Sequence, residues 1–336
     1  IARWAVWNGV LMKKGLIGIE LGSKNLRIYS KEKDQILRLK NVIALTEDSE
    51  TAAVGNEAFS MYEKEPHQIQ IITPMVHGVI GDYTNMRRLL AQILRRYLRK
   101  LKKYEFYMAV PSDITGVERR AFYDLMLESF RSVKEVRLCP KPMADAVGLG
   151  IDVGAPCGNM VINMGADTTE ISVISLGGIV RSRLVKQGGS QIDQWMISKL
   201  KRNHNIEIGM KSAERLKLLY ARREEEGKPA YVKGRDLVSG LPKKIQVPGD
   251  LAEEKVRSYV NDIIIEAKAM LEVIPPELAS DIMVEGIYLS GGSSSFQKIP
   301  EWMEDAIGIH IRTGEQPEES VVRGLKTMMN KDYKYQ

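Results

Sequence analysis

Polar residues separate two apolar runs in residues 160–176, and their types suit the binding of phosphate oxygens. The polar stretch covers residues 163–169 and includes Gly165, Thr168 and Thr169. Gly165 can adopt turn geometries that a Cβ atom opposes, so the pattern predicts a strand, a tight turn and a second strand. Backbone N–H groups in such a turn, together with the threonine hydroxyls, bind phosphate oxygens well. The same pattern is typical of an ordinary β-hairpin, and this stretch alone leaves both interpretations open.

Residues 16–30 repeat this arrangement near the start of the chain. An apolar run again reaches a polar turn and continues into an alternating strand. Aligning the two turns pairs Glu20 with Asn163, Gly22 with Gly165, Ser23 with Ala166 and Asn25 with Thr168. An internal repeat of about half the chain length predicts two related domains, each presenting a hairpin turn to a shared cleft. A nucleotide held between the two turns is the hypothesis that follows.

The composition limits the class of protein. The chain has 336 residues, enough for two domains with their own cores, and its 44% hydrophobic and 27% charged fractions are typical of a soluble globular protein. No apolar run reaches the roughly 18 residues that span a bilayer. Cys139 and Cys157 are too few for a disulfide framework or a zinc site, which favours a reduced cytoplasmic protein. The net charge of +6 does not require a nucleic-acid partner, and none is expected.

Residues 1–11 differ from the rest of the sequence. They hold Trp4 and Trp7 with a single charge, and they precede a Met-Lys-Lys at Met12 that resembles a translation start. The segment is too short for a signal peptide and lacks a cleavage region. We interpret it as an N-terminal extension outside the native fold. An interfacial membrane anchor built on Trp4, Trp7 and Leu11 is the alternative.

A helix with two distinct faces is predicted from Asp82 onward. Apolar residues recur at the i, i+3, i+4, i+7 spacing between positions 86 and 101. The opposite face carries Arg87, Arg88, Arg95, Arg96, Arg99, Lys100, Lys102 and Lys103. A charged helix face is commonly just the solvated face, but the density and single sign of this one also fit an anionic membrane surface.

Strands and helices alternate along the rest of the chain, which predicts an α/β fold with mixed sheets. A strand is expected over residues 104–110. Thr115 and Glu118 have the spacing of a capping box, which opens the next helix. A helix with small residues is expected to start over 142–148. The charged segment 221–236 is predicted to be a surface loop.

The chain as a whole resembles the MreB family of bacterial actin-like proteins, within the superfamily of actin, sugar kinases and heat-shock chaperone ATPases. The likeness runs from about residue 15 to about residue 327 and rests on motifs in the same order. These are PSDIT at 111–115, VERR at 117–120, PMA at 142–144, TTE at 168–170, VISLGGIV at 173–180, GRDLVSGLP at 234–242 and PPELASDI at 275–282.

The resemblance implies an actin-like fold, in which two related α/β domains surround a nucleotide cleft. Each domain would have a mixed five-stranded sheet, flanking helices and a smaller subdomain. Domain I is expected in residues 12–141 and 319–336, with its small subdomain at about 32–66. Domain II is expected in 142–318, with its small subdomain at about 183–245.

The resemblance also implies ATP and Mg²⁺ as ligands, and it assigns the nucleotide contacts. Glu20 would hold Mg²⁺ weakly, through water. The residues implied to contact the nucleotide are Ser23, Lys24 and Asn25 in the first turn; Gly165, Ala166, Asp167 and Thr168 in the second; Glu214, Arg215, Leu216 and Lys217 on a helix; and Gly291, Gly292, Ser293 and Ser294 in an adenine-side loop. Converging turns suit this role because their N–H groups hold phosphate oxygens without a preformed charge.

Several positions of the implied site differ from the family. Where the family usually begins both turns with Asp, this chain has Glu20 and Asn163, and loss of a carboxylate weakens a Mg²⁺ site. The family usually has Glu before the Pro-Met pair to position or activate the attacking water. This chain has Lys141, whose ammonium cannot act as a base. Ser190 replaces an acidic residue, and Asp167 adds negative charge beside the phosphates. No catalytic residue is therefore assigned.

These features favour an MreB-like protein that binds ATP with weakened hydrolysis, so its ATPase activity stays open. The resemblance implies filaments of identical subunits beneath the inner face of the cytoplasmic membrane, with cell-wall synthesis and shape proteins as partners. One alternative is an ordinary ATPase with compensating residues. Lys141 and the lack of an evident catalytic carboxylate disfavour a sugar kinase. A non-polymerising actin-fold scaffold or regulator with a degenerate nucleotide site is the main alternative.

Overall fold

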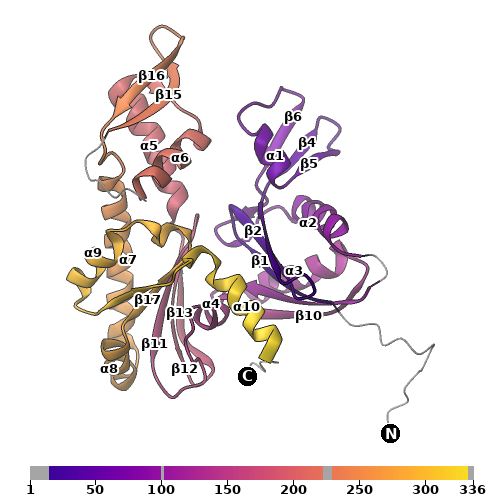
Figure 1. Ribbon diagram of the computed structural model, residues 1–336, viewed down its shortest axis with the longest axis vertical. Helices are drawn as coiled ribbons and strands as arrows, with labels where there is room; N and C mark the ends of the chain where they lie inside the picture. The colour runs from indigo at the N-terminus through magenta and orange to yellow at the C-terminus, as the bar shows by residue number, and fades with distance from the viewer. Residues whose placement is uncertain (1–14, 100–101, 222–228, 332–336) are drawn as a thin grey trace.

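The computed structural model describes residues 15–99, 102–221 and 229–331. Two five-stranded sheets, sheet I and sheet II, form the lower part of the molecule in Figure 1, and two smaller sheets with their helices stand above them. Half I denotes residues 15–140 together with helix α10 (Ser320–Lys331). Half II denotes residues 159–319.

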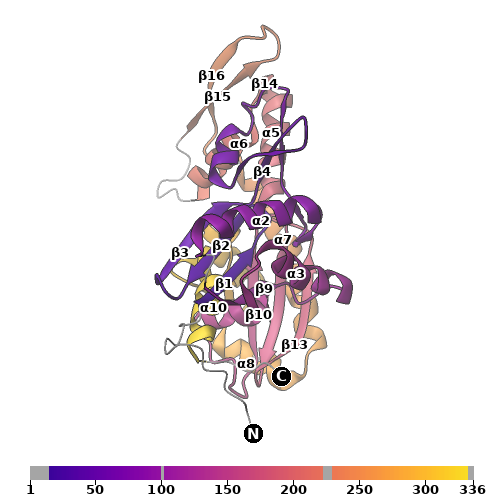
Figure 2. The same ribbon diagram turned by 90° about the vertical axis from the view of Figure 1, so that its right-hand side faces the viewer.

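Half I is built on sheet I, whose strand order is β10-β9-β1-β2-β3. These strands are β1 (Gly15–Leu21), β2 (Asn25–Ser30), β3 (Gln35–Lys40), β9 (Tyr104–Val110) and β10 (Val133–Pro140). The predicted strand 104–110 is confirmed. Helices α2 (Tyr83–Tyr97) and α3 (Gly116–Ser129) pack on one face of the sheet, and α10 packs on the other (Figure 2).

Half II is built on sheet II, whose strand order is β13-β12-β11-β17-β18. These strands are β11 (Asn159–Met164), β12 (Thr169–Ser175), β13 (Gly178–Val185), β17 (Ile287–Ser290) and β18 (Ile311–Thr313). The helices that complete this half are α7 (Glu253–Val273), α8 (Pro276–Glu285) and α9 (Ile299–Ile307). Buried residues of α7 and α9 join those of β11 and β12 in one apolar core.

The two sheets share one topology. Strands β1, β2, β3, β9 and β10 correspond in order to β11, β12, β13, β17 and β18. In both sheets the first two strands pair antiparallel, and the first and fourth pair parallel. The repeat predicted from residues 16–30 and 160–176 is therefore confirmed, as is the prediction of two related α/β halves with mixed five-stranded sheets.

Each large sheet carries a smaller three-stranded one. In half I this sheet comprises β4 (Ile43–Thr46), β5 (Thr51–Val54) and β6 (Ile69–Ile72), with α1 (Asn56–Met61); β7 (Met75–Val76) and β8 (Val79–Ile80) follow as a hairpin. In half II it comprises β14 (Ile206–Glu207), β15 (Ala230–Asp236) and β16 (Pro242–Val247), with α5 (Gly189–His204) and α6 (Met210–Ala221). The loop predicted over 221–236 is wrong at 230–236, because β16 pairs with that segment; residues 222–228 lie outside the described chain.

The amphipathic helix is shorter than its apolar pattern. α2 ends at Tyr97, because Leu98 adopts an extended conformation before the chain turns into β9, and residues 100–101 lie outside the described chain. Part of its basic face is neutralised, since Arg87 lies 3.6 Å from Glu128 and Arg96 lies 3.4 Å from Glu57. Within the described residues, no helix combines the length and apolar character needed to cross a membrane. The capping box that opens α3 is confirmed.

Helix α4 (Lys141–Gly148) lies between the two sheets and packs against α10 with no side chain between the two backbones. A Cβ atom at Gly148 would lie 1.7 Å from the carbonyl oxygen of Ser320, and one at Gly324 would lie 1.6 Å from that of Ala144. Only glycine fits at these two positions. Helix α4 begins at Lys141, the residue that directly follows the end of β10.

Candidate functional site

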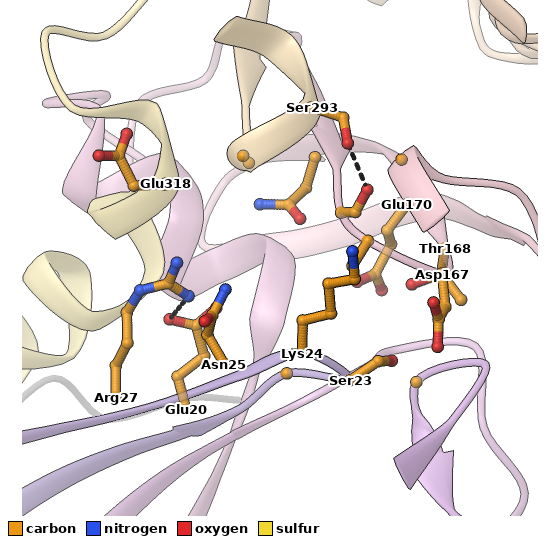
Figure 3. Close-up of a pocket in the computed structure, with 18 of the residues that line it drawn as sticks. Glu20, Ser23, Lys24, Asn25, Arg27, Asp167, Thr168, Glu170, Ser293 and Glu318 are labelled. Atoms are coloured by element: carbon orange, nitrogen blue, oxygen red, sulfur yellow. Dashed lines mark hydrogen bonds and ion pairs between the residues drawn. The ribbon is translucent and has the colours of Figure 1, made fainter. Parts of the chain in front are cut away.

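A cleft with a volume of about 290 Å³ opens between the two halves, and both repeat turns line it. The predicted site residues that line it are Glu20, Ser23, Lys24, Asn25, Gly165, Ala166, Asp167, Thr168, Glu214, Lys217, Gly291, Gly292 and Ser293. Figure 3 shows side chains of both halves around this space, among them Lys24 of half I and Thr168 and Ser293 of half II. Arg215 is exposed, whereas Leu216 and Ser294 are buried outside the lining. Of the altered positions, Lys141 and Asn163 line the cleft and Ser190 does not.

The two turns are closed by the same hydrogen bond. The Gly22 N–H donates to the Asn25 carbonyl at 3.0 Å, and the Gly165 N–H donates to the Thr168 carbonyl at 2.8 Å. A Cβ on either glycine would lie 2.8 Å from that carbonyl oxygen, so a larger residue would open the turn. Tight turns of this kind bring successive backbone N–H groups together as an anion-binding concavity. The cleft therefore presents two equivalent turns, one from each half, whose geometry suits the binding of an anion.

The carboxylate of the first turn is already paired. Glu20 stands opposite Arg27 in the β1–β2 register, and Arg27 Nη1 lies 3.2 Å from Glu20 Oε2. The two side chains are 10% and 12% exposed, and both line the cleft. Directly opposite residues of antiparallel strands lie on the same face, which is why these two side chains meet. The guanidinium neutralises the carboxylate within the cleft wall.

Behind the second turn, Asn163 covers a buried carboxylate on α4. Its Nδ2 donates to Asp145 Oδ2 at 2.7 Å and to Ser290 Oγ at 2.9 Å. Asp145 is fully buried, and this burial raises the pKa of its carboxyl group, although the hydrogen bonds from Ser290, Ser320 and Asn163 oppose the shift. The cleft side of this network presents a neutral amide, because Asp145 lies behind it.

A second buried carboxylate, Glu170, joins the two halves. The Ser112 N–H and Oγ both donate to Glu170 Oε1, at 2.9 Å and 2.7 Å. Glu170 Oε2 has no hydrogen-bond partner, and the residue lines the cleft at 2% exposure. Burial raises the pKa of Glu170, while the nearby ammonium of Lys141 lowers it to a smaller extent. Lys141 itself forms no ion pair within 4.0 Å in the described chain.

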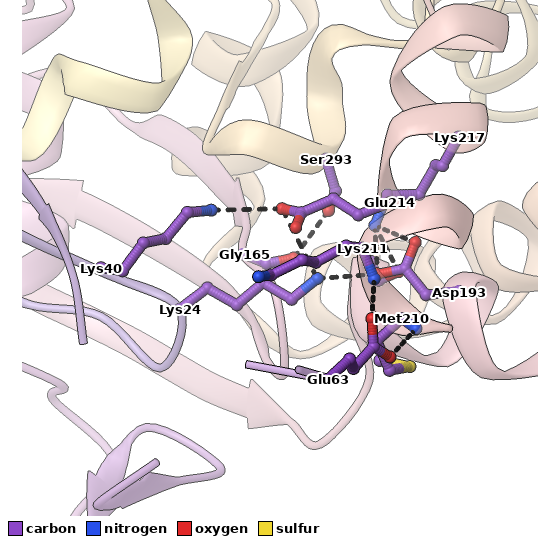
Figure 4. A network of polar contacts seen from close by, with 11 residues as sticks. Lys24, Lys40, Glu63, Gly165, Asp193, Met210, Lys211, Glu214, Lys217 and Ser293 are labelled. Carbon is purple, nitrogen blue, oxygen red and sulfur yellow. Dashed lines mark hydrogen bonds and ion pairs between the residues drawn. The ribbon is translucent and has the colours of Figure 1, made fainter. Parts of the chain in front are cut away.

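Lysines on both sides of the cleft converge on Asp193 and Glu214, as Figure 4 shows. Lys24 Nζ lies 2.7 Å from Asp193 Oδ2 across the cleft, and Lys217 Nζ donates to the same oxygen at 2.8 Å. Lys40 Nζ lies 3.5 Å from Glu214 Oε1. Burial lowers the pKa of Lys217, and repulsion from Lys24 lowers it further. Two lysines thus share one buried carboxylate and link the halves.

A further contact joins the halves at the smaller sheets. The Glu63 carboxylate accepts from the backbone N–H groups of Met210 and Lys211, the latter at 3.2 Å, so it caps the start of α6. Lys211 Nζ lies 4.8 Å from the centre of the Phe59 ring. The cleft is therefore bridged both near the turns and above them.

Sequence reasoning does not identify Asp193, Arg27 or Ser112, because each meets its partner only in the folded chain. Asp193 nevertheless leaves a signal. It lies beside Ile192 and shares the buried stripe of α5 with Met196. An acidic residue in an apolar helix stripe needs a cation in the fold, and two lysines supply it.

The donor set of the cleft does not fit Mg²⁺. Magnesium is held by carboxylates and water in near-octahedral geometry, but Glu20 is paired with Arg27 and position 163 is an amide. Among the described residues, no three side chains of His, Cys, Asp or Glu form a group that could hold a metal ion. The arrangement suits the binding of an anion, and Lys141 offers no base for water attack.

Three comparisons identify related proteins. A family profile described as "MreB/Mbl protein" matches residues 14–336. Cell shape-determining protein Mbl of Bacillus subtilis (strain 168) is 34% identical over 322 residues, which cover 94% of this chain and 95% of that protein. Cell shape-determining protein MreB of Escherichia coli (strain K12) is 32% identical over 320 residues, which cover 92% of this chain and 91% of that protein.

A solved structure has the same fold as this chain. The crystal structure of MreB 5 of Spiroplasma citri bound to AMPPNP superposes with a TM-score of 0.89 at 28% sequence identity. The match covers 95% of this chain and 97% of that one. The two halves and their smaller sheets therefore constitute the actin-like fold of that protein.

Proposed function

The chain belongs to the MreB/Mbl family, and from that premise we propose that it is a cytoskeletal protein that binds ATP in the cleft and assembles into filaments. The observation that carries this proposal is the pair of equivalent turns, closed by the same hydrogen bond and facing each other across one cleft. A related protein with the same fold binds a nucleotide analogue, which supports the cleft as the nucleotide site. The residues proposed to contact ATP are the predicted ones that line the cleft.

Hydrolysis of ATP is proposed to be weak. The family usually activates the attacking water with a glutamate, and this chain has Lys141 at that position. We expect the purified chain to release phosphate from ATP about a hundredfold more slowly than B. subtilis Mbl under the same conditions, which is the usual effect of losing a general base. Nucleotide binding measured on the same samples separates slow chemistry from failed binding. Release at the rate of Mbl would contradict the proposal and favour compensating residues.

Filament assembly is supported by apolar surface at both ends of half II. Val238 and Leu241, in the connection between β15 and β16, are 83% and 66% exposed. Met283 and Val284 on α8 are 68% and 77% exposed. These elements lie at opposite ends of the long axis of the molecule (Figure 1). Head-to-tail contact between two such ends gives a heterologous interface that does not close, and such an interface builds a filament.

Val238→Asp and Val284→Asp are each expected to weaken filament assembly, because a charge would be buried at the subunit contact. Both variants should raise the critical concentration by about tenfold or more, measured by sedimentation and negative-stain electron microscopy with ATP. Ile265→Asp is the matched control, since Ile265 is 65% exposed on the middle of α7. A wild type that stays monomeric at every concentration would favour the non-polymerising scaffold, and variants that pellet normally would reject these two contacts.

Membrane association and a role in cell shape are further parts of the proposal. The related Mbl and MreB proteins are named as cell shape-determining, and we extend that role, with guidance of cell-wall synthesis, to this chain. The basic face of α2 supports contact with an anionic lipid surface at the inner side of the membrane. Its ion pairs with Glu57 and Glu128 reduce the charge available for that contact.

A further inference from the structure

The cleft contains a lysine, Lys141, whose ammonium makes no ion pair in the described chain, although the carboxyl groups of Glu170 and Asp145 act on it electrostatically from farther away. Lys141 stands at the first position of α4, directly after Pro140, and lines the cleft without an ion pair within 4.0 Å in the described chain. The other cleft lysines near the turns are engaged: Lys24 with Asp193, and Lys217 with Asp193 and the Gly189 carbonyl. The Lys141 ammonium is thus available to an incoming anion.

Most carboxylates around Lys141 are paired or buried, so they are not available as metal ligands. Glu20 is paired with Arg27, and Asp145 is fully buried behind the amide of Asn163. Glu170 is held by two hydrogen bonds from Ser112, and its burial favours the neutral acid. Of the acidic residues that line the cleft in the described chain, Asp167 and Glu318 are seen without a partner, and of these two Asp167 alone lies in one of the turns. A single carboxylate is a poor site for Mg²⁺.

We propose that the cleft binds ATP without a divalent cation, with the Lys141 ammonium neutralising charge on the phosphates. The inference rests on the proposed nucleotide site and specifies the form of nucleotide that the site takes. A lysine ammonium attracts phosphate as a point charge. Because Lys141 is part of α4, its positive charge is already present in the cleft. No metal ion therefore has to bind together with the nucleotide.

The test is the affinity of the full chain for ATP, measured by isothermal titration calorimetry in excess Mg²⁺ and in excess EDTA. The two dissociation constants are expected to agree within about twofold, a free-energy difference under about 0.5 kcal/mol. Lys141→Met should weaken binding in EDTA about tenfold, whereas Lys141→Arg should retain it. Lys268→Met is the matched control, because Lys268 is an exposed lysine on α7 outside the cleft.

Two variants sharpen the test. Lys141→Glu restores the acidic residue of the family and is expected to make ATP binding depend on Mg²⁺. Asp167→Asn is expected to strengthen binding in EDTA, because it removes a negative charge beside the phosphates. If the wild type bound ATP only in Mg²⁺, the inference would be overturned while the proposed nucleotide site stands. If the Asp167→Asn variant then showed no such dependence on Mg²⁺, the metal would be assigned to Asp167. Absence of binding in both buffers would overturn the proposed function and the inference with it.

Discussion

Asn163→Asp is expected to lower the free energy of unfolding by about 3 kcal/mol at neutral pH. The substitution restores the carboxylate that the family usually has at this position, but here it would face another. Asn163 Nδ2 lies 2.7 Å from Asp145 Oδ2, and Asp145 is fully buried. The variant would lose a hydrogen bond and place two carboxylates in contact away from water.

The loss should shrink as the pH falls. Two touching carboxylates share a proton, so the folded variant keeps that proton at a pH where the unfolded chain, with aspartate pKa values of about 3.9, has released it. A folded pKa above the unfolded one makes stability increase as the pH decreases toward the unfolded value. Urea denaturation at about pH 8 and about pH 5 measures both the loss and its recovery.

The exchange Asp145→Asn with Asn163→Asp is the matched control. It keeps one carboxylate and one amide at the same two positions, so most of the stability should return. Asp145→Asn alone should stabilise the protein above neutral pH, because burial raises the pKa of Asp145 and the fold therefore opposes its charged form. If Asn163→Asp were as stable as the wild type at every pH, the contact between positions 145 and 163 would not be the reason for the amide.

Gly148→Ala and Gly324→Ala are each expected to destabilise the protein by about 3 kcal/mol or more. The added Cβ atoms would lie 1.7 Å from the Ser320 carbonyl oxygen and 1.6 Å from the Ala144 carbonyl oxygen. The opposing atoms belong to the backbone, so the clash is relieved only if α4 and α10 separate. Thermal denaturation and the yield of folded protein measure the effect.

Gly116→Ala serves as the control for these two glycines. An added Cβ at Gly116 meets no heavy atom within 4 Å, and the residue opens α3. Alanine is the better helix former, so this variant should be neutral or more stable by up to about 1 kcal/mol. If Gly148→Ala had the same melting temperature as the Gly116→Ala control, α4 and α10 would be able to separate at little cost in free energy.

The sequence predicted those parts of the fold that depend on residues close together along the chain. The repeated apolar-turn-apolar sequence predicted equivalent turns, and the closing bonds of Gly22 and Gly165 match. Thr115 and Glu118 predicted a helix start because both partners of a capping box lie within one turn. The strand at 230–236 was missed, since its charged residues lie on a surface hairpin where pairing with β16 outweighs composition.

The chemistry of the cleft was only partly predictable. The change from Asp to Asn at position 163 was visible in the sequence as a lost carboxylate. Its cause was not, because Asp145 comes from another element and meets it through tertiary packing. Asp193 is a similar case, as its two lysines lie 169 and 24 residues away along the chain. Such pairs are specified by the folded arrangement, because their partners come from elements that lie far apart along the chain.

The position of α10 has a consequence for biosynthesis. The core on its side of sheet I includes Val321, Val322, Leu325 and Met329, which reach the sheet only after all of half II. A nascent chain on the ribosome therefore carries sheet I with the part of this apolar face that α10 covers still exposed while half II is being translated. Half I completes its folding last although its strands are made first, and exposed apolar surface in that interval is where a chaperone would act.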